Sequence, residues 1–368
     1  MRIASLEVVP YALPFREPYV TARGSLTRRE MVLLRLRDED GLVGLGEAVP
    51  LSLRGGASLT QVVGELQSLA EHDELDEARL RSAPAQLSAP ARCAALTALL
   101  DLRGRRAAAN PPPAPRSPFQ SPPEGNDYGG GGREPVRCNA TLVAGDPAAV
   151  VSDAERWAAD GFSTFKLKLG TGDDAAQVRA VREAVGARAK IRVDVNGAWD
   201  LATAKQVLAE LEPYEIELAE QPVATLGEAA ELAGSTSIPL AADESVESRS
   251  DAERVAGAGA FALTGIKLSK VGGPEEALEI AEVLPAYVTS ALDGPVGIAA
   301  ALQVAQSLGD LGRGAGERLA HGLATQRLFT TTIAAVECEL RGDLLHPPDG
   351  PGLGVEIDED ALSAHRLG

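Results

Sequence analysis

Three acidic residues lie at the ends of three successive apolar segments and could together bind a divalent cation. Asp194 lies in KIRVDV, Glu220 ends EIELAE and Asp243 ends IPLAAD. Such segments are typical of buried strands, and the carboxyl ends of neighbouring parallel strands lie at one edge of a sheet. A single acidic residue at a strand end more commonly caps the next helix, but three in consecutive units favour a metal site. Carboxylate oxygens suit Mg²⁺, with Mn²⁺ as the alternative.

Lysines flank these acidic residues along the chain. Lys166 and Lys168 lie two residues apart in STFKLKL, so both side chains point to one face of a strand, and Lys267 lies in ALTGIKL. We expect burial and mutual repulsion to lower the pKa of these ammonium groups, which would let a lysine act as a base. Exposed lysines at a strand end would carry no such chemistry. Lys270, just after ALTGIKL, is the alternative to Lys267.

The combination predicts an enzyme that removes a proton from the carbon beside a carboxylate. A cation next to the substrate carboxylate withdraws electrons from it, and cation and ammonium together stabilise the enediolate that forms. Lys166, Lys168 and Lys267 are therefore candidate catalytic residues, and the substrate is expected to be a small carboxylate. A protein that only stores metal would gain nothing from lysines on both sides of the acidic residues.

The elements that must position these residues predict a parallel (β/α) barrel over residues 133–326. Eight apolar or β-branched segments alternate with Ala- and Glu-rich helical stretches. This alternation is typical of a barrel whose active site lies at the carboxyl ends of its strands. A doubly wound open sheet is the alternative, but it needs a glycine-rich phosphate loop after its first strand, and none follows RCNATL. The eight segments are RCNATL, STFKLKL, KIRVDV, EIELAE, IPLAAD, ALTGIKL, AYVTSAL and ERLAHG.

Residues 1–106 predict an α+β capping domain in front of the barrel. A strand is expected at 31–36 (MVLLRL), followed by a hairpin turn at DEDG (38–41). From residue 58 to about residue 106 the apolar residues have helical spacing, which predicts helices there. Residues 107–132 are rich in proline and then in glycine, and predict a linker without helix or strand. Residues 327–368 add no further β/α unit, and we expect them to pack on the capping domain.

Composition narrows the class of protein. The formal net charge of −18 argues against nucleic acid and anionic membrane surfaces as partners, because phosphate binding needs clustered Lys and Arg. Cys93, Cys138 and Cys338 are too few and too scattered for a disulfide framework or a thiolate metal site. No apolar run is long enough to cross a membrane, and no signal peptide is evident, so a cytoplasmic location is expected. Assembly into a homo-oligomer is compatible with the sequence.

Five short segments, in this order and at these spacings, resemble the muconate-lactonizing-enzyme subgroup of the enolase superfamily. They are KLK (166–168), RVDVNGAW (192–199), EQP (220–222), ADES (242–245) and IKLSKVGG (266–273), and TARGSLTRRE (21–30) and GLGEAVPL (44–51) resemble that subgroup's capping domain. The resemblance implies a modified TIM barrel completed by its capping domain and C-terminal segment. It also implies metal ligation by the three acidic residues, with Lys168 as acid/base on one face of the substrate and Lys267 on the other. The proline- and glycine-rich tract departs from the family, which has a short turn there.

Within the subgroup, TARGSLTRRE, GEAVPL and TSALDGPVGIAAA (289–301) look most like the o-succinylbenzoate synthases of menaquinone biosynthesis. This resemblance implies a lyase that dehydrates 2-succinyl-6-hydroxy-2,4-cyclohexadiene-1-carboxylate to o-succinylbenzoate. N-acylamino-acid racemases and dipeptide epimerases fit the same residues, with both lysines as bases. Muconate cycloisomerases fit less well, because nothing in the sequence is specific for a dicarboxylate diene. The candidate substrate-binding residues are Asn196, Thr289, Ser290, Gly294 and, on a loop that closes over the succinyl chain, Arg23 and Arg29.

Overall fold

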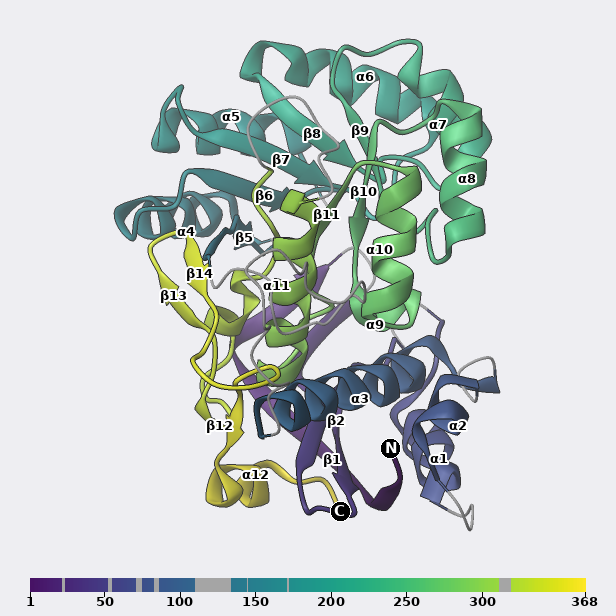
Figure 1. Ribbon diagram of the computed structural model, residues 1–368. Helices are drawn as coiled ribbons and strands as arrows, with labels where there is room; N and C mark the ends of the chain where they lie inside the picture. Colours follow the sequence, from purple (N-terminus) through teal and green to yellow (C-terminus); the bar gives the residue numbers. More distant parts are fainter. Residues whose placement is uncertain are drawn as a thin grey trace, which may run out of the picture.

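A computed structural model describes residues 1–21, 24–51, 55–70, 75–82, 86–109, 134–143, 145–170, 172–310 and 319–368. An N-terminal α+β unit packs against a barrel of parallel strands, and the C-terminal segment returns to the N-terminal unit (Figure 1). The predicted architecture is therefore confirmed.

The N-terminal unit is an antiparallel meander covered by helices. Its strands are β1 (Ile3–Thr21), β2 (Gly24–Asp38) and β3 (Val43–Ala48), and its helices are α1 (Leu59–Ala70), α2 (Glu77–Ser82) and α3 (Ala89–Ala109). The turn between β2 and β3 is held by Asp38, whose Oδ1 accepts from the Asp40 and Leu42 N–H groups, and by Gly41 at φ +85°. Arg23 lies outside the described residues.

Two glycines in β3 allow helix α3 to lie directly on the sheet. A Cβ on Gly44 would stand 2.2 Å from the Ala98 carbonyl oxygen, and one on Gly46 would stand 2.0 Å from the Ala94 carbonyl oxygen. Either contact would force the helix away, so the spacing of these glycines sets the helix–sheet distance. Leu99 of α3 is fully buried in the core that forms there.

The barrel contains seven parallel strands hydrogen-bonded in sequence order. They are β5 (Ala140–Leu142), β6 (Thr164–Lys168), β7 (Lys190–Asp194), β8 (Ile216–Glu220), β9 (Leu240–Ala242), β10 (Leu263–Ile266) and β11 (Ala286–Val288). The helical elements between and after them are α4 (Pro147–Ala159), α5 (Asp174–Val185), α6 (Leu201–Leu211), η3 (Glu212–Tyr214), α7 (Leu226–Ala233), α8 (Arg249–Ala258), α9 (Leu268–Val271), α10 (Pro274–Val283) and α11 (Pro295–Asp310).

The eighth strand position is reduced to single bridges that close the barrel. His321 forms a parallel bridge with Cys138 next to β5, and Gly322 forms one with Thr289 next to β11. The His321 N–H donates to the Arg137 carbonyl at 2.7 Å. All eight predicted strand segments therefore take part in the ring, although the last is barely a strand and Glu317 and Arg318 of ERLAHG lie outside the described residues.

The C-terminal segment contacts both units. It contains η4 (Ala324–Leu328), β12 (Ala334–Val336), β13 (Glu339–Arg341), β14 (Leu344–His346), β15 (Glu356–Ile357) and α12 (Glu359–His365), and β14 pairs with β4 (Val136–Arg137). Its attachment to β1 includes bridges from Phe329 to Phe15 and from Arg366 to Tyr11. These bridges place the C-terminal segment on the N-terminal unit, as expected.

One boundary differs in detail from the expectation. Helix α3 continues to Ala109, so the first three residues of the predicted 107–132 linker are helical, and the rest of that tract lies outside the described residues. The predicted domain division as a whole stays a prediction. Within the described ranges, every helix is too short or too polar to cross a bilayer.

Candidate active site

The three acidic residues lie at one rim of the barrel because their strands are adjacent and parallel. In the register, Asp194 at the end of β7 is opposite Glu220 at the end of β8, and Asp243 directly follows β9. The solvent-exposed fraction of each of the three residues is 0%. Carboxylates taken fully out of water require compensating positive charge, and the lysines supply it.

Two lysines of β6 reach the first two carboxylates. Lys168 is opposite Asp194 in the register, and its Nζ lies 2.5 Å from the Asp194 Oδ2. The Lys166 Nζ lies 2.8 Å from the same oxygen and 2.6 Å from the Glu220 Oε2. Lys168 also donates to the Asn196 Oδ1 at 3.0 Å. Both lysines therefore face the barrel interior, as their two-residue spacing predicts.

The third carboxylate is contacted by two lysines from the next strand's end. Lys267, directly after β10, forms an ion pair with the Asp243 Oδ2, and the Lys270 Nζ lies 2.8 Å from the Asp243 Oδ1. Lys267 is one of the residues that line a cavity between the barrel and the N-terminal unit, whereas Lys270 is not one of them. The geometry therefore favours Lys267 over Lys270 as the residue that meets a substrate.

The expected direction of the lysine pKa shifts is wrong. Burial disfavours the charged form of Lys166, but the Asp194 and Glu220 carboxylates outweigh it and raise the Lys166 pKa well above its ordinary value. For Lys168, burial is likewise outweighed, chiefly by Asp194, and the pKa is raised. Burial opposes ionisation of Asp194 too, but Lys166 and Lys168 hold its pKa below the ordinary range. The two-residue spacing predicts that the lysines lie next to each other, but it does not reveal that the Asp194 and Glu220 carboxylates lie within 2.8 Å of Lys166.

The chemistry of the buried carboxylates fits a divalent cation. Among the residues that the structure describes, no three His, Cys, Asp or Glu side chains are grouped as a metal site. Asp194, Glu220 and Asp243 each form an ion pair with a lysine. The Glu220 Oε1, however, is buried without a hydrogen-bond partner. An unpartnered buried carboxylate oxygen is costly, and a cation would remove that cost.

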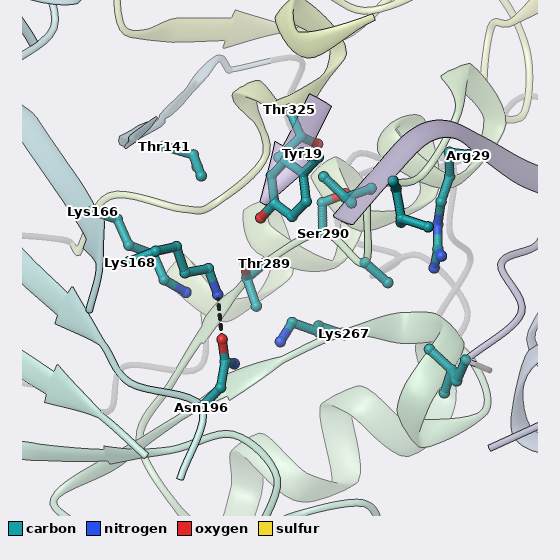
Figure 2. A pocket seen from close by; sticks show the side chains of 14 residues that line it. Tyr19, Arg29, Thr141, Lys166, Lys168, Asn196, Lys267, Thr289, Ser290 and Thr325 are labelled. Atoms are coloured by element: carbon teal, nitrogen blue, oxygen red, sulfur yellow. Dashed lines mark hydrogen bonds between the residues drawn. The ribbon is translucent and has the colours of Figure 1, made fainter. Parts of the chain in front are cut away.

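Lys166, Lys168 and Lys267 line a cavity between the barrel and the N-terminal unit (Figure 2). Its barrel side is polar, and apolar residues from the N-terminal unit and from the segment after β11 form much of the rest. The lining residues are Tyr19, Leu26, Arg29, Leu51, Thr141, Lys166, Lys168, Asn196, Lys267, Thr289, Ser290, Ala291, Leu292 and Thr325.

Of the predicted substrate-binding residues, four line this cavity. Asn196, Thr289 and Ser290 do so from the barrel, and Arg29 does so from the N-terminal unit. Arg29 is in strand β2 and not on a loop, is 8% exposed, and donates to the Pro50 carbonyl at 2.9 Å. Its expected place on a closing loop is therefore wrong, because β1 and β2 extend as a long hairpin over the barrel.

The predicted substrate-binding role of Gly294 is also not supported, because Gly294 is not among the residues that line the cavity. Its N–H donates to the Glu47 Oε1 at 2.6 Å, and a Cβ there would meet the Tyr11 hydroxyl at 2.3 Å. The contact with the N-terminal unit needs a glycine at this position, because any side chain would collide with Tyr11 and Glu47.

Several cavity residues were missed by the sequence reasoning. Tyr19 and Leu26 come from the β1–β2 hairpin, and Thr325 comes from the segment after the barrel. The stacked rings of Tyr19 and Phe15, with centroids 5.6 Å apart, place Tyr19 at the cavity. No local signal in the sequence indicates that the segment around Tyr19 reaches the barrel.

The chain forms a closed (β/α) barrel that is capped by an α+β unit. Buried carboxylates and lysines lie at the carboxyl ends of the barrel strands. This combination defines a class of barrel enzymes. Two family models match the chain: the mandelate racemase/muconate lactonizing enzyme N-terminal domain over residues 3–110, and the enolase C-terminal domain-like family over residues 149–361. The chain belongs to the enolase superfamily, in the muconate cycloisomerase subgroup. Members of this superfamily are enzymes that abstract a proton and then dehydrate or isomerise the substrate.

Individual relatives differ in activity. An o-succinylbenzoate synthase of Thermobifida fusca (strain YX) is 38% identical over 239 aligned residues, which cover 62% of this chain and 71% of that enzyme. A muconate lactonizing enzyme of Pseudomonas fluorescens, complexed with muconolactone, superposes with a TM-score of 0.85 at 28% identity over 99% of both chains. A dipeptide epimerase of Enterococcus faecalis V583, complexed with Mg and L-Leu-L-Tyr, gives 0.82 at 25% identity over 97% of this chain and all of that one.

Proposed function

We propose that this protein is an o-succinylbenzoate synthase, a lyase of menaquinone biosynthesis that dehydrates 2-succinyl-6-hydroxy-2,4-cyclohexadiene-1-carboxylate. The observation that carries the proposal is the pair Lys168 and Lys267, whose amino groups point into one cavity from opposite sides (Figure 2). A planar ring held between two lysines has an acid/base on one face and a cation on the other. The resemblance to the Thermobifida fusca synthase supports this choice among the subgroup's reactions.

The reaction begins with proton removal at the ring carbon that bears the carboxylate. Lys168 takes this proton as a neutral amine, a form that requires the Asp194 carboxylate, which raises the Lys168 pKa, to be engaged by the cation instead. The electron pair of the broken C–H bond moves into the carboxylate as an enediolate, whose negative charge the Lys267 ammonium stabilises. The C–O bond of the ring hydroxyl then breaks, and the departing oxygen takes the proton from Lys168. Water leaves, and the remaining electrons complete an aromatic ring.

The acidic residues have a defined part in this proposal. Asp194, Glu220 and Asp243 would hold Mg²⁺, or Mn²⁺, whose charge would polarise the substrate carboxylate and compete with the lysines for the carboxylate oxygens. Asn196 accepts a hydrogen bond from the Lys168 Nζ, and so orients this lysine toward the cavity.

The remaining walls suit the rest of the substrate. Leu26, Leu51 and Leu292 offer apolar surface for the ring and the methylene groups. We propose that Arg29 binds the carboxylate of the succinyl chain, because Arg29 lines the same cavity and a carboxylate is the usual partner of a guanidinium. Thr289 and Ser290 provide hydroxyls beside the chain.

The test is conversion of the cyclohexadiene carboxylate by purified protein with Mg²⁺, followed by the loss of diene absorbance and by chromatography of o-succinylbenzoate. Lys168→Ala and Lys267→Ala are expected to lower the rate by a factor on the order of 10²–10⁴. Lys205→Ala is the matched control, since Lys205 is a half-exposed lysine of α6 paired with Glu231. A wild-type protein that leaves the substrate unchanged would show the proposed function to be wrong.

A second candidate is racemisation or epimerisation of N-acylamino acids or dipeptides. It is favoured by the same two lysines on opposite sides of the cavity and by the fold shared with the Enterococcus faecalis epimerase. In this reaction one lysine removes the α-proton and the other returns a proton to the opposite face. Deuterium uptake at the α-carbon of N-succinyl amino acids in D₂O tests it, and muconate is the third substrate to compare.

The same assays test the metal. Stripping the protein with a chelator is expected to stop α-proton exchange, and added Mg²⁺ to restore it. An exchange rate that does not respond to the chelator would contradict the metal part of the proposal. Assembly into a homo-oligomer stays a prediction, which the size of the purified protein in solution would decide.

A further inference from the structure

A buried tyrosine from the far side of the barrel reaches one of the proposed metal ligands. Tyr287 lies in β11, three strands away from β8, and its hydroxyl donates a hydrogen bond to the Glu220 Oε2. Both side chains are fully buried. Tyr287 has no part in the proposed reaction.

The barrel interior is built to admit this ring. Gly265 of β10 is opposite Tyr287 in the register, and a Cβ on Gly265 would stand 3.1 Å from the Tyr287 hydroxyl oxygen and 3.2 Å from its Cζ. These contacts are closer than ordinary van der Waals contact, so a Cβ at this position would force the ring to shift by a few tenths of an ångström. Leu218 and Leu263 pack in the same small cluster as Tyr287. The absence of a side chain at Gly265 therefore lets the phenol cross to Glu220.

The buried Arg192 side chain packs against the face of the Tyr287 ring. The Arg192 guanidinium carbon lies 5.0 Å from the Tyr287 ring centroid, within the range of a cation–π contact. Arg192 is itself immobilised, because it donates to the Glu217 Oε2 at 2.5 Å and to the Ala320 carbonyl at 2.6 Å. Tyr287 consequently has little freedom to turn its hydroxyl away from Glu220.

The two carboxylate oxygens of Glu220 have different surroundings. The Oε2 receives the Tyr287 hydroxyl and lies 2.6 Å from the Lys166 Nζ, whereas the Oε1 is buried without a hydrogen-bond partner. A carboxylate held through one oxygen presents the other in a single direction. Such a fixed donor is what a divalent cation with a strict coordination geometry needs.

We propose that Tyr287 is a positioning residue that orients Glu220 for the divalent cation, with Arg192 and Gly265 keeping its ring in place. This inference rests on the proposed function, since it assumes that Glu220 is a metal ligand. Tyr287 touches neither substrate nor metal, and acts only through Glu220.

The test is Mn²⁺ binding to the metal-free full-length protein, measured as the loss of the free-ion signal in electron paramagnetic resonance. Tyr287→Phe deletes only the hydroxyl, and is expected to raise the Mn²⁺ dissociation constant about 10- to 100-fold, the usual effect of removing a hydrogen bond to a metal ligand. Tyr11→Phe is the matched control: Tyr11 is an equally buried tyrosine whose hydroxyl donates to the Glu47 Oε2 at 2.8 Å, away from the acidic rim. It should keep the wild-type dissociation constant.

The outcomes separate the inference from the function on which it rests. If the wild-type protein binds Mn²⁺ and Tyr287→Phe binds it equally well, the positioning role is overturned and the proposed function stands. If the wild-type protein binds no Mn²⁺, both are overturned. If Tyr287→Phe does not fold, Gly265→Ala replaces it, because its methyl group forces the ring and its hydroxyl to shift relative to Glu220 without removing the hydroxyl. Weaker Mn²⁺ binding by that variant supports the inference, and unchanged binding overturns it.

Discussion

Glu47 is a carboxylate buried between the N-terminal unit and the barrel, and its protonation should control how stability depends on pH. It is 2% exposed, accepts from the Gly294 N–H at the start of α11, and accepts from the Tyr11 hydroxyl. Burial, followed by the nearby Asp293 carboxylate, raises the pKa of Glu47 from 4.5 to about 8, although the hydrogen bonds oppose this. The Cys93 thiol also lies within electrostatic range of Glu47.

Whether stability rises or falls with pH depends on whether the folded or the unfolded chain holds the Glu47 proton more tightly. Below pH 4.5 Glu47 is protonated in both the folded and the unfolded chain, and its contribution to stability is fully present. As the pH rises toward 8, the unfolded chain releases the proton while the folded chain keeps it, so stability falls. A pKa of about 8 against the ordinary 4.5, at about 1.4 kcal/mol per pH unit, corresponds to roughly 5 kcal/mol.

Glu47→Gln removes this titration and keeps the shape of the side chain. Urea unfolding of wild type and variant from pH 5 to pH 9, at constant ionic strength, gives the difference between their free energies of unfolding. We expect this difference to shift by several kcal/mol in favour of the variant as the pH rises, with most of the change complete near pH 8. Glu231→Gln is the control, because Glu231 is 61% exposed, and it should show no such slope. A difference between wild type and Glu47→Gln that stays constant with pH would refute the reasoning.

Other substitutions test the packing and the cavity. Leu99→Ala, in the fully buried contact of α3 with the sheet, should lower the free energy of unfolding by about 2–5 kcal/mol in urea titrations. Asp101→Asn should cost about 1–3 kcal/mol in the same experiment, because this carboxylate accepts from the Leu45 and Leu353 N–H groups and so links β3 to the C-terminal segment. Arg29→Met should raise the KM for the cyclohexadiene carboxylate at least tenfold, with a smaller change in kcat, in steady-state kinetics; an unchanged KM would argue against its contact with the succinyl carboxylate.

The strand order of the barrel was predictable because it follows from local pattern. Each β-rich segment between helical stretches could be recognised by itself, and consecutive parallel strands of a barrel are neighbours. Asp194 and Glu220 had to lie side by side once KIRVDV and EIELAE were read as adjacent strands. The same rule placed Lys168 beside Asp194, because their strands are also consecutive.

The electrostatics of the site were not predictable in the same way. The raised pKa of Lys166 depends on two carboxylates within 2.8 Å, and such distances depend on side-chain directions across neighbouring strands. Arg29 and Tyr19 enter the cavity because the β1–β2 hairpin is long enough to reach the barrel. Gly294 is not among the residues that line the cavity, and its N–H donates to the Glu47 Oε1.

The sequence by itself determined the class of chemistry. Acidic and lysine residues at the ends of successive strands indicate a cation site and a base, since their order along the chain is also their order around the ring. Only the tertiary structure decided which residues from distant segments complete the cavity, and that Tyr287 crosses the barrel to Glu220. The reason is physical: periodicity and composition are local properties, whereas a contact between non-adjacent strands exists only after the barrel closes and its interior is packed.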